Sequence, residues 1–279
     1  SDLRLMPGVF TAGQINGTSG YEEAAAQGIM AGINAALYAL ERDAFILPRS
    51  SSYTGTLIDD LVTKEIGEPY RMMTSRSEYR LLLRQDNADM RLTPLGREVG
   101  MVDDYRWQLF VEKQEAIETE KKRVKSVRIH PNPEWEEALA PYDESMKQSA
   151  TLEELLRRPK VPYSVINTLA PASEEGFAFG LEVETDIKYA GYIERQRLLI
   201  AQTEKLDGFK LPLDFNYLAS DHLSKEAREK LNKIRPMTLG QASRIGGVSP
   251  ADISVLMVLL EQQRRASYKD SCDKAGVSV

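Results

Sequence analysis

The sequence has little of the chemistry that marks secreted, metal-binding or membrane proteins. One cysteine, Cys272, among 279 residues excludes an intrachain disulfide and any metal cluster built on cysteines. The two histidines, His130 and His222, are far apart in the chain, which argues against a histidine-rich metal site. The longest apolar run, residues 253–260, is far shorter than the roughly twenty residues of a membrane helix. With no secretion signal at the N-terminus either, we expect a soluble, cytoplasmic protein with no metal site and no membrane partner.

Charge and composition further limit the class of protein to which this sequence can belong. Lys and Arg number 36 against 42 Asp and Glu, which gives a net charge of −6. With 42% hydrophobic and 28% charged residues, the chain has the composition of a folded protein of roughly one to three domains. Because the whole chain is mildly acidic, any binding of nucleic acid must come from a local basic patch.

The first fifty residues read as the end of an α/β domain. Residues 7–13 predict a short buried strand that ends in a glycine turn, and a helix follows from about Tyr21 to Leu40. Gly28 and Gly32 share a helix face and suggest close packing on a sheet. One strand and one helix cannot bury both of their faces, so we interpret residues 1–50 as the last strand and helix of a domain whose earlier part is missing. The apolar stripe of this helix is expected at Ala24, Ile29, Ile33 and Leu37.

The loop between this strand and helix has the features of a ligand site. Gly13, Gly17 and Gly20 permit positive φ and a close approach of the backbone to a ligand. The helix start directs free N–H groups and a partial positive charge at the same space, which favours a phosphate or a reduced flavin ring. Gln14 is placed to hydrogen-bond a sugar-like hydroxyl chain. The alternative is a glycine-rich turn that only closes an α/β unit.

A basic segment follows at residues 71–97, where six arginines and three acids give a local charge of 6 − 3 = +3. The spacing of Ser75 and Glu78 is that of a capping box, which predicts a helix from Arg76. On such a helix Arg76, Arg80 and Arg84 would share one face and could bind RNA phosphate, with Tyr79, Leu82 and Leu83 as anchors. The alternative is that nearby acids neutralise these arginines within the fold. Those acids are Glu78, Asp86, Asp89 and the pair Asp59 and Asp60.

From about residue 104 the sequence predicts helices only. We expect one domain over 51–210, made of the basic segment and the first of these helices, and a C-terminal helical subdomain over 211–279. Capping and stop signals give the boundaries, among them a capping box at Thr151 and Glu154 and a serine cap at Ser224. Residues 267–279 are interpreted as a tail. The last two helices around Gly246 and Gly247 could form a helix-turn-helix, but the second one begins without a basic residue, so DNA binding is not expected. The helices are expected at 104–128, from Thr151 to before Pro159, and at 186–206, 224–234, 238–245 and from 249 onward.

Nine segments of the sequence share a close resemblance to one known family. They are 12–28, 31–36, 53–60, 68–72, 74–76, 78–81, 86–89, 189–196 and 240–245. The family that they resemble is the MnmG (GidA) family of tRNA-modifying enzymes, and the resemblance covers nearly the whole chain apart from about a dozen C-terminal residues. Tyr189 and Tyr192, inside one of these segments, are interpreted as core or interface residues.

The resemblance implies the C-terminal portion of an FAD-dependent enzyme, with an α/β remnant of an FAD-binding domain followed by a mainly α-helical C-terminal domain. Such enzymes use NADH as reductant, form homodimers, and act with the GTPase MnmE on C5 of the wobble uridine (U34) of tRNA. The C-terminal subdomain is expected to dock MnmE. The family's catalytic cysteines and a Gly-x-Gly-x-x-Gly turn are not in this sequence, so no catalytic residue is assigned, the FAD site is expected to be incomplete and this chain alone to be inactive.

By the same resemblance we assign cofactor binding to Gln14, Asn16, Gly17, Gly20, Tyr21 and Glu22, and tRNA binding to Arg71, Arg76, Arg80 and Arg84. Two alternatives stay open. One is a folate- and FAD-dependent tRNA uridine methyltransferase, which shares the Ala-Gly-Gln loop. The other is an interaction module without catalysis.

Overall fold

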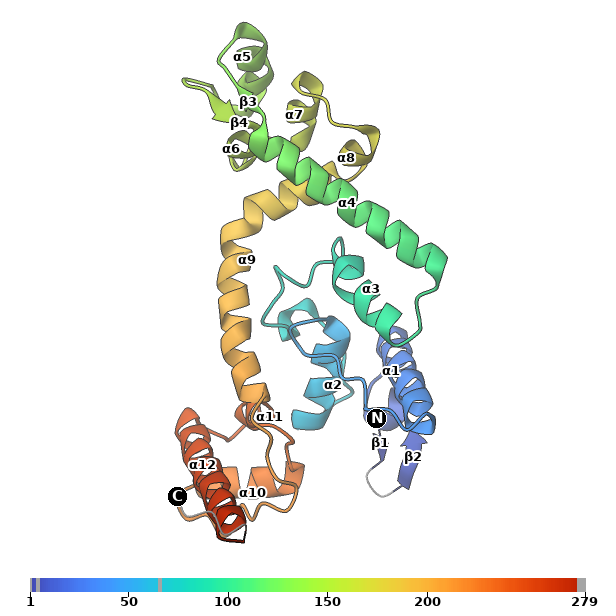
Figure 1. Ribbon diagram of the computed structural model, residues 1–279, viewed down its shortest axis with the longest axis vertical. Coiled ribbons are helices and arrows are strands. Elements are labelled where there is room, and N and C mark those ends of the chain that lie inside the picture. Colours follow the sequence, from blue (N-terminus) through green and yellow to red (C-terminus); the bar gives the residue numbers. More distant parts are fainter. Residues whose placement is uncertain (1, 4–5, 65–66, 275–279) are drawn as a thin grey trace. The chain divides into compact units, whose positions relative to one another are not determined.

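The computed structural model describes residues 2–3, 6–64 and 67–274, with side chains described for 6–64 and 67–262 (Figure 1). The chain divides into two compact units. We call residues 1–77 together with 198–279 the terminal unit, and residues 78–197 the central unit. None of the helices in the described part is both long and apolar enough to cross a bilayer.

The terminal unit begins with a small hairpin beside a long helix (Figure 1). Strand β1 (Asp2–Leu3) pairs antiparallel with β2 (Met6–Phe10), and α1 (Tyr21–Ala39) packs against β2. The prediction of a buried strand is wrong, since the first four residues of β2 are exposed. Its one sheet partner within the described residues is the two-residue β1, which cannot cover it. Helix α2 (Tyr53–Thr63) and the single turn η2 (Thr74–Arg76) complete this part of the unit.

Helix α1 buries one face and leaves another open. Leu37 is buried together with the polar side chain of Gln27. The predicted apolar stripe is wrong at Ile29, whose side chain is 58% exposed. Gly28 and Gly32 do not pack closely on a sheet, since a Cβ at either position would have no neighbour within 4 Å in the described structure. The open face of α1 is therefore lined by small residues around one exposed isoleucine.

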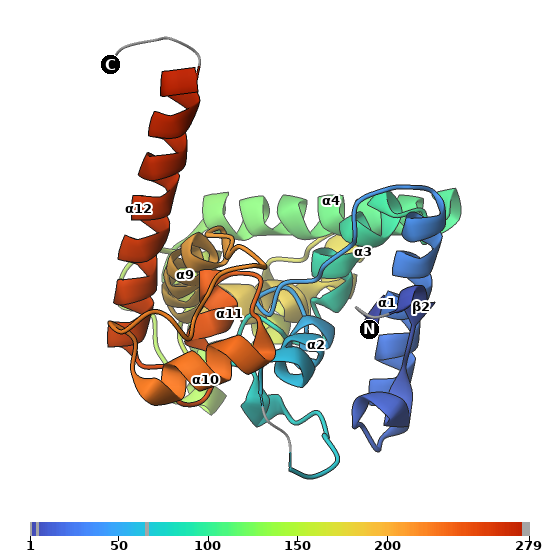
Figure 2. The same ribbon diagram turned by 90° about the horizontal axis from the view of Figure 1, so that it is seen from below.

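The C-terminal part of the terminal unit is a three-helix bundle. Helices α10 (Lys225–Ile234), α11 (Leu239–Ser243) and α12 (Pro250–Lys274) surround one buried apolar cluster, and we call them the C-terminal bundle (Figure 2). The cap predicted at Ser224 is confirmed, because its hydroxyl accepts a hydrogen bond from the first turn of α10, and the hydroxyl of Thr238 caps α11 in the same way. The predicted tail is wrong up to Lys274, because α12 continues that far.

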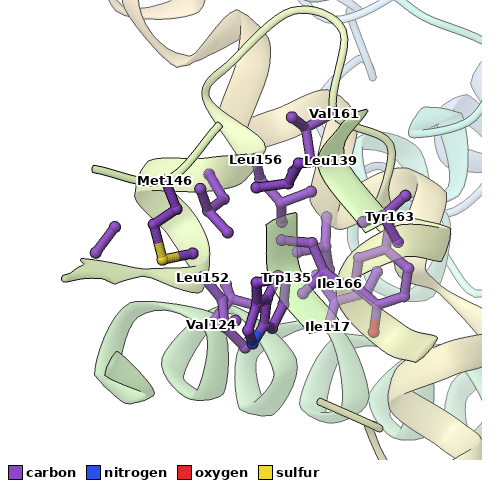
Figure 3. Close-up of a cluster of buried hydrophobic side chains, with 14 residues drawn as sticks. Ile117, Val124, Trp135, Leu139, Met146, Leu152, Leu156, Val161, Tyr163 and Ile166 are labelled. Carbon is purple, nitrogen blue, oxygen red and sulfur yellow. The ribbon is translucent and has the colours of Figure 1, made fainter. Parts of the chain in front are cut away.

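The central unit is organised around α4 (Asp104–Ser126). Figure 3 shows its core, in which Ile117 and Val124 of α4 lie among Trp135, Leu152 and Ile166 from the segments that follow. The capping box predicted at Thr151 is confirmed, with its hydroxyl and Glu154 each bonded to the other residue's backbone N–H. The other helices of this unit are α3 (Ala88–Glu98), α5 (Pro133–Leu139), η3 (Ala140–Tyr142), α6 (Leu152–Leu156), α7 (Tyr163–Leu169), α8 (Glu174–Ala178) and the first part of α9 (Gly180–Asp207).

Two predictions for the central unit need correction. The chain after residue 104 is not purely helical, because β3 (Arg128–Ile129) and β4 (Ala150–Thr151) pair antiparallel. Helix α9 begins at Gly180, six residues before the predicted start at Asp186, and ends at Asp207, one residue after the predicted end at Leu206. Gly180 is required there because a Cβ would collide with the buried ring of Tyr163.

Candidate functional site

The glycine loop predicted as a ligand site, residues 11–20, is held by the side-chain amides of Gln27, which is buried, and Asn16, which is partly buried. Gly13 and Gly17 adopt φ of +84° and +83°, as predicted, in and after the single turn η1 (Gly13–Asn16). The buried Gln27 of α1 accepts a bond from Asn16 Nδ2 at 2.7 Å and donates one to Thr18 Oγ1 at 3.0 Å. Asn16 also donates to the carbonyl oxygen of Thr11 at 2.9 Å. The Asn16 amide therefore shapes the loop from within.

Gly20 does not take positive φ; its φ is −96° and it is the N-cap of α1. A Cβ at this position would collide with the carboxylate of Glu23, which folds back over the helix start. Glu23 Oε1 accepts a hydrogen bond from the backbone N–H of Met72 at 2.7 Å, and this bond is the main reason that the pKa of Glu23 is lowered. Gly20 thus leaves room for a carboxylate that attaches residues 70–72 to the loop.

The same segment forms a strand-like bridge with the loop. Tyr70 N–H donates to the carbonyl of Gly17 at 2.7 Å, and Ser19 N–H donates to the carbonyl of Tyr70 at 3.4 Å. The ring of Tyr70 is fully buried and its hydroxyl donates to Asp60 of α2 at 2.9 Å. Residues 70–72 therefore connect the glycine loop to α2.

An open pocket of about 610 Å³ lies beside this junction. It is lined by Gln14, residues 16–19, Leu61 of α2, Lys64 directly after α2, and residues 67–69. The exposed Gln14 and the ammonium of Lys64 offer hydrogen bonds to a polar ligand. Of the six residues predicted to bind a cofactor, Gln14, Asn16 and Gly17 line the pocket. Gly20, Tyr21 and Glu22 begin α1, next to the loop in sequence.

A buried charge cluster supports the pocket from the side of α2. The carboxylate of Asp60 is fully buried and binds Lys64 Nζ at 2.8 Å, the guanidinium of Arg49 and the hydroxyl of Tyr70. Burial opposes ionisation of Asp60, but the hydrogen bonds from Lys64 and Arg49 outweigh it, so the pKa of Asp60 is lowered. Burial, followed by the bond to Asp60, raises the pKa of Tyr70. The tyrosine therefore stays protonated as the donor.

The predicted helix from Arg76 is wrong. Only the single turn η2 forms, and Ser77 after it is buried and extended. Tyr79 and Leu83 are buried anchors, as predicted, but the residues between them form turns. Because no helix spans these positions, Arg76, Arg80 and Arg84 do not share a helix face.

Each of the four predicted tRNA-binding arginines has a different environment. Arg71 and Arg80 are exposed. Arg76 lies over the ring of Tyr70, with its guanidinium carbon 4.2 Å from the ring centroid. Arg84 pairs with Asp86 and with Asp186 of α9, at 3.0 Å and 2.8 Å. The alternative in which acids neutralise the arginines within the fold therefore applies to Arg84.

The sequence interpretation missed the buried residues that hold the loop, namely Glu23, Gln27, Arg49 and Tyr70. One signal was available, because Glu23 and Gln27 are four apart on a helix and polar residues at this spacing share a face. Arg49 and Tyr70 lie outside regular elements, and no spacing rule indicates their contacts.

Three family models match this chain. "Glucose inhibited division protein A" matches residues 2–43, which contain the glycine loop and α1. "tRNA modifying enzyme MnmG/GidA C-terminal helical domain" matches residues 104–197, and "tRNA modifying enzyme MnmG/GidA C-terminal helical bundle" matches residues 199–277. The last two models meet within α9, where the two units also meet in the chain.

Individual relatives agree with these models. The chain is 52% identical over 267 residues to the tRNA uridine 5-carboxymethylaminomethyl modification enzyme MnmG of Geobacillus thermodenitrificans, and 53% identical over 266 residues to the protein of that name from Synechocystis. Each match covers 95% of this chain and 42% of the relative, so the chain spans less than half of their length. Its structure is similar to that of Aquifex aeolicus GidA, with a TM-score of 0.79, 42% identity and coverage of 93% of this chain and 41% of that one.

Proposed function

Because this chain belongs to the MnmG/GidA family, we propose that it is the C-terminal portion of an FAD-dependent enzyme that modifies the wobble uridine of tRNA. In this proposal the whole enzyme acts with the GTPase MnmE and adds a carboxymethylaminomethyl or aminomethyl group to C5 of that uridine. The observation that carries it is the 52% identity, over 95% of this chain, to a relative named for this modification. The roles assigned to this chain are tRNA contact and partner docking.

The pocket beside the glycine loop fits part of a flavin. Gly17 lines the pocket with positive φ, and a ligand can approach its backbone because a Cβ there would have no neighbour within 4 Å in the described structure. The first N–H groups of α1 lack partners within the helix. The exposed Gln14 can hydrogen-bond a hydroxyl chain, while Lys64 places a positive charge at the pocket. When bound, FAD supplies the redox chemistry, with NADH as reductant. The residues assigned to its binding are Gln14, Asn16, Gly17, Gly20, Tyr21 and Glu22.

The pocket is open, and the residues assigned to the flavin come from one loop and one helix start. We therefore expect the 279-residue chain alone to bind FAD weakly and to have no modification activity. Stoichiometric flavin absorbance in the purified chain would contradict this expectation.

Binding of tRNA is assigned to Arg71, Arg76, Arg80 and Arg84. Arg71 and Arg80 are exposed and can each pair with a phosphate. Arg76 of the terminal unit is held over Tyr70, and Arg84 of the central unit is held by Asp86 with Asp186, so in this proposal each presents a fixed guanidinium group within its own unit. Affinity for tRNA should therefore fall steeply with salt concentration.

Docking of MnmE is assigned to the C-terminal bundle. Met257 and Val258 of α12 and Met237 before α11 are exposed apolar residues on this bundle. Exposed apolar side chains of this kind favour a protein partner. We also propose that the whole enzyme is a homodimer and is cytoplasmic, as we expect from the sequence.

The nucleosides of cellular tRNA test the proposed activity. Disruption of the gene should remove the carboxymethylaminomethyl or aminomethyl group from the wobble uridine, measured by mass spectrometry of hydrolysed tRNA. The gene with its reading frame intact should restore it. Loss of a C5-methyl uridine instead would favour the folate- and FAD-dependent methyltransferase, and an unchanged nucleoside profile would favour an interaction module without catalysis.

A further inference from the structure

Two tyrosines of α9 in the central unit are exposed. The side chains of Tyr189 and Tyr192 are 42% and 57% exposed, so they are not core residues. Their ring centroids are 6.4 Å apart and the ring planes are tilted by 54°. Because the rings do not stack face to face, they leave aromatic surface open to a further planar group.

The loop of residues 78–82, which carries Arg80, is attached to the same side of α9. Gln196 follows Tyr192 by four positions and so lies about one turn further along that face, about 6 Å away along the axis. Its Oε1 accepts a hydrogen bond from Leu82 N–H at 3.1 Å, and its Nε2 donates to the carbonyl of Glu78 at 3.5 Å. The exposed Arg80 lies between these two attachment points.

The charge around the rings has the sign that RNA requires. The exposed ionic residues of segments 78–82 and 189–197 are three arginines and two glutamates, a local charge of 3 − 2 = +1 in a chain of −6. They are Arg80, Arg195, Arg197, Glu78 and Glu194. Aromatic rings beside cationic side chains are the combination by which proteins hold unpaired nucleotides.

We infer that Tyr189 and Tyr192 form a base-stacking surface for unpaired nucleotides of the RNA substrate, with Arg80 as the neighbouring phosphate contact. This inference rests on the proposed function, because it specifies how the central unit would contact tRNA. In this inference the tyrosines recognise unpaired bases, and the arginine attracts the phosphate groups.

The test compares two labelled RNAs by fluorescence anisotropy with the 279-residue chain. One is an anticodon stem-loop, which has unpaired bases, and the other is a blunt RNA duplex of the same number of phosphates. The double variant Tyr189→Leu/Tyr192→Leu should bind the stem-loop at least about tenfold more weakly, because one or two base stacks are lost, and should bind the duplex unchanged. Tyr189→Phe/Tyr192→Phe keeps the rings and should stay within about twofold of the unsubstituted chain.

Two controls complete the design. Tyr105→Leu removes a tyrosine of α4 that is 73% exposed, and it should leave binding of both RNAs unchanged. A stem-loop with 2-aminopurine in its loop should be quenched by the unsubstituted chain and not by the double leucine variant, which reports stacking independently of affinity.

Each outcome decides one proposal or both. If the unsubstituted chain binds neither RNA, tRNA contact by this chain and the stacking surface are both wrong. If it binds the stem-loop and the leucine variant binds it equally well, only the stacking surface is wrong, and the tyrosines serve another partner such as a protein. Equal losses for stem-loop and duplex would also overturn the stacking surface.

Discussion

The guanidinium of Arg244 makes two hydrogen bonds to the carboxylate of Asp59, a residue 185 positions earlier in the chain (Nε to Oδ2 2.8 Å, Nη2 to Oδ1 3.0 Å). Arg244 caps α11 in the C-terminal bundle, and Asp59 belongs to α2 beside the candidate pocket. Arg244 also donates to Asp207 at the end of α9. One side chain therefore links α2, α9 and α11 within the terminal unit.

Replacement of this arginine should loosen the terminal unit. Arg244→Ala leaves two partly buried carboxylates without their shared partner, so we expect a loss of about 3 kcal/mol in the free energy of unfolding. The urea midpoint measured by circular dichroism would report it. The exposed Arg195→Ala should stay within about 0.5 kcal/mol, and similar losses for both variants would contradict a joining role for Arg244.

Two glycine substitutions should have opposite effects on stability. Gly20→Ala places a Cβ against the Glu23 carboxylate and should break its bond to Met72 N–H, at a cost of about 1–3 kcal/mol. Gly28→Ala, inside the same helix, meets no neighbour and should stabilise the chain by about 0.5–1 kcal/mol. Thermal unfolding measures both, and destabilisation by Gly28→Ala would show that this face of α1 is covered.

Acid should weaken the cluster around Asp60. Its pKa in the folded chain lies below the ordinary value of 3.8, so its contribution to stability is present above about pH 3.8 and is lost as pH falls through the folded value. Asp60→Asn should therefore be less stable than the unsubstituted chain at pH 7, and the difference should narrow below pH 4.

Urea unfolding at a series of pH values measures this effect. Asp43→Asn, at an exposed position, is the matched control and should change the free energy of unfolding at pH 7 by less than about 0.5 kcal/mol. A constant difference for Asp60→Asn between pH 7 and pH 3 would mean that its ionisation does not stabilise the fold.

Substitution of Arg80 should weaken RNA binding, whereas substitution of Arg84 should lower the stability of the fold. Arg80→Ala removes an exposed charge and should lower both the affinity for tRNA and the slope of log affinity against log salt by about one unit, with unfolding unchanged. Arg84→Ala removes the guanidinium that Asp86 and Asp186 share, leaves Asp186 with Lys121 alone, and should lower the unfolding midpoint. Anisotropy with labelled tRNA and thermal unfolding on the same samples distinguish the two, and unchanged tRNA affinity for Arg80→Ala would remove it from the proposed contact.

The helix boundaries that sequence signals predicted correctly depend on short-range chemistry. Thr151 with Glu154, Ser224 and Thr238 are caps whose partners lie three residues away, so the local sequence holds all the atoms of each motif. The same spacing at Ser75 and Glu78 predicted a helix that does not form. There the carbonyl of Arg76 accepts from Arg49 and the guanidinium of Arg76 lies over Tyr70, so distant contacts hold the segment in turns.

The sequence alone determined the glycine loop, the long helices and the family, because each depends on residues that are neighbours along the chain. Only the tertiary structure decided which polar groups support that loop and which arginines are exposed. Those outcomes depend on pairs such as Asp60 with Tyr70, Arg84 with Asp186 and Arg244 with Asp59. Their energies come from burial and from partners many residues away, and neither is encoded in local spacing.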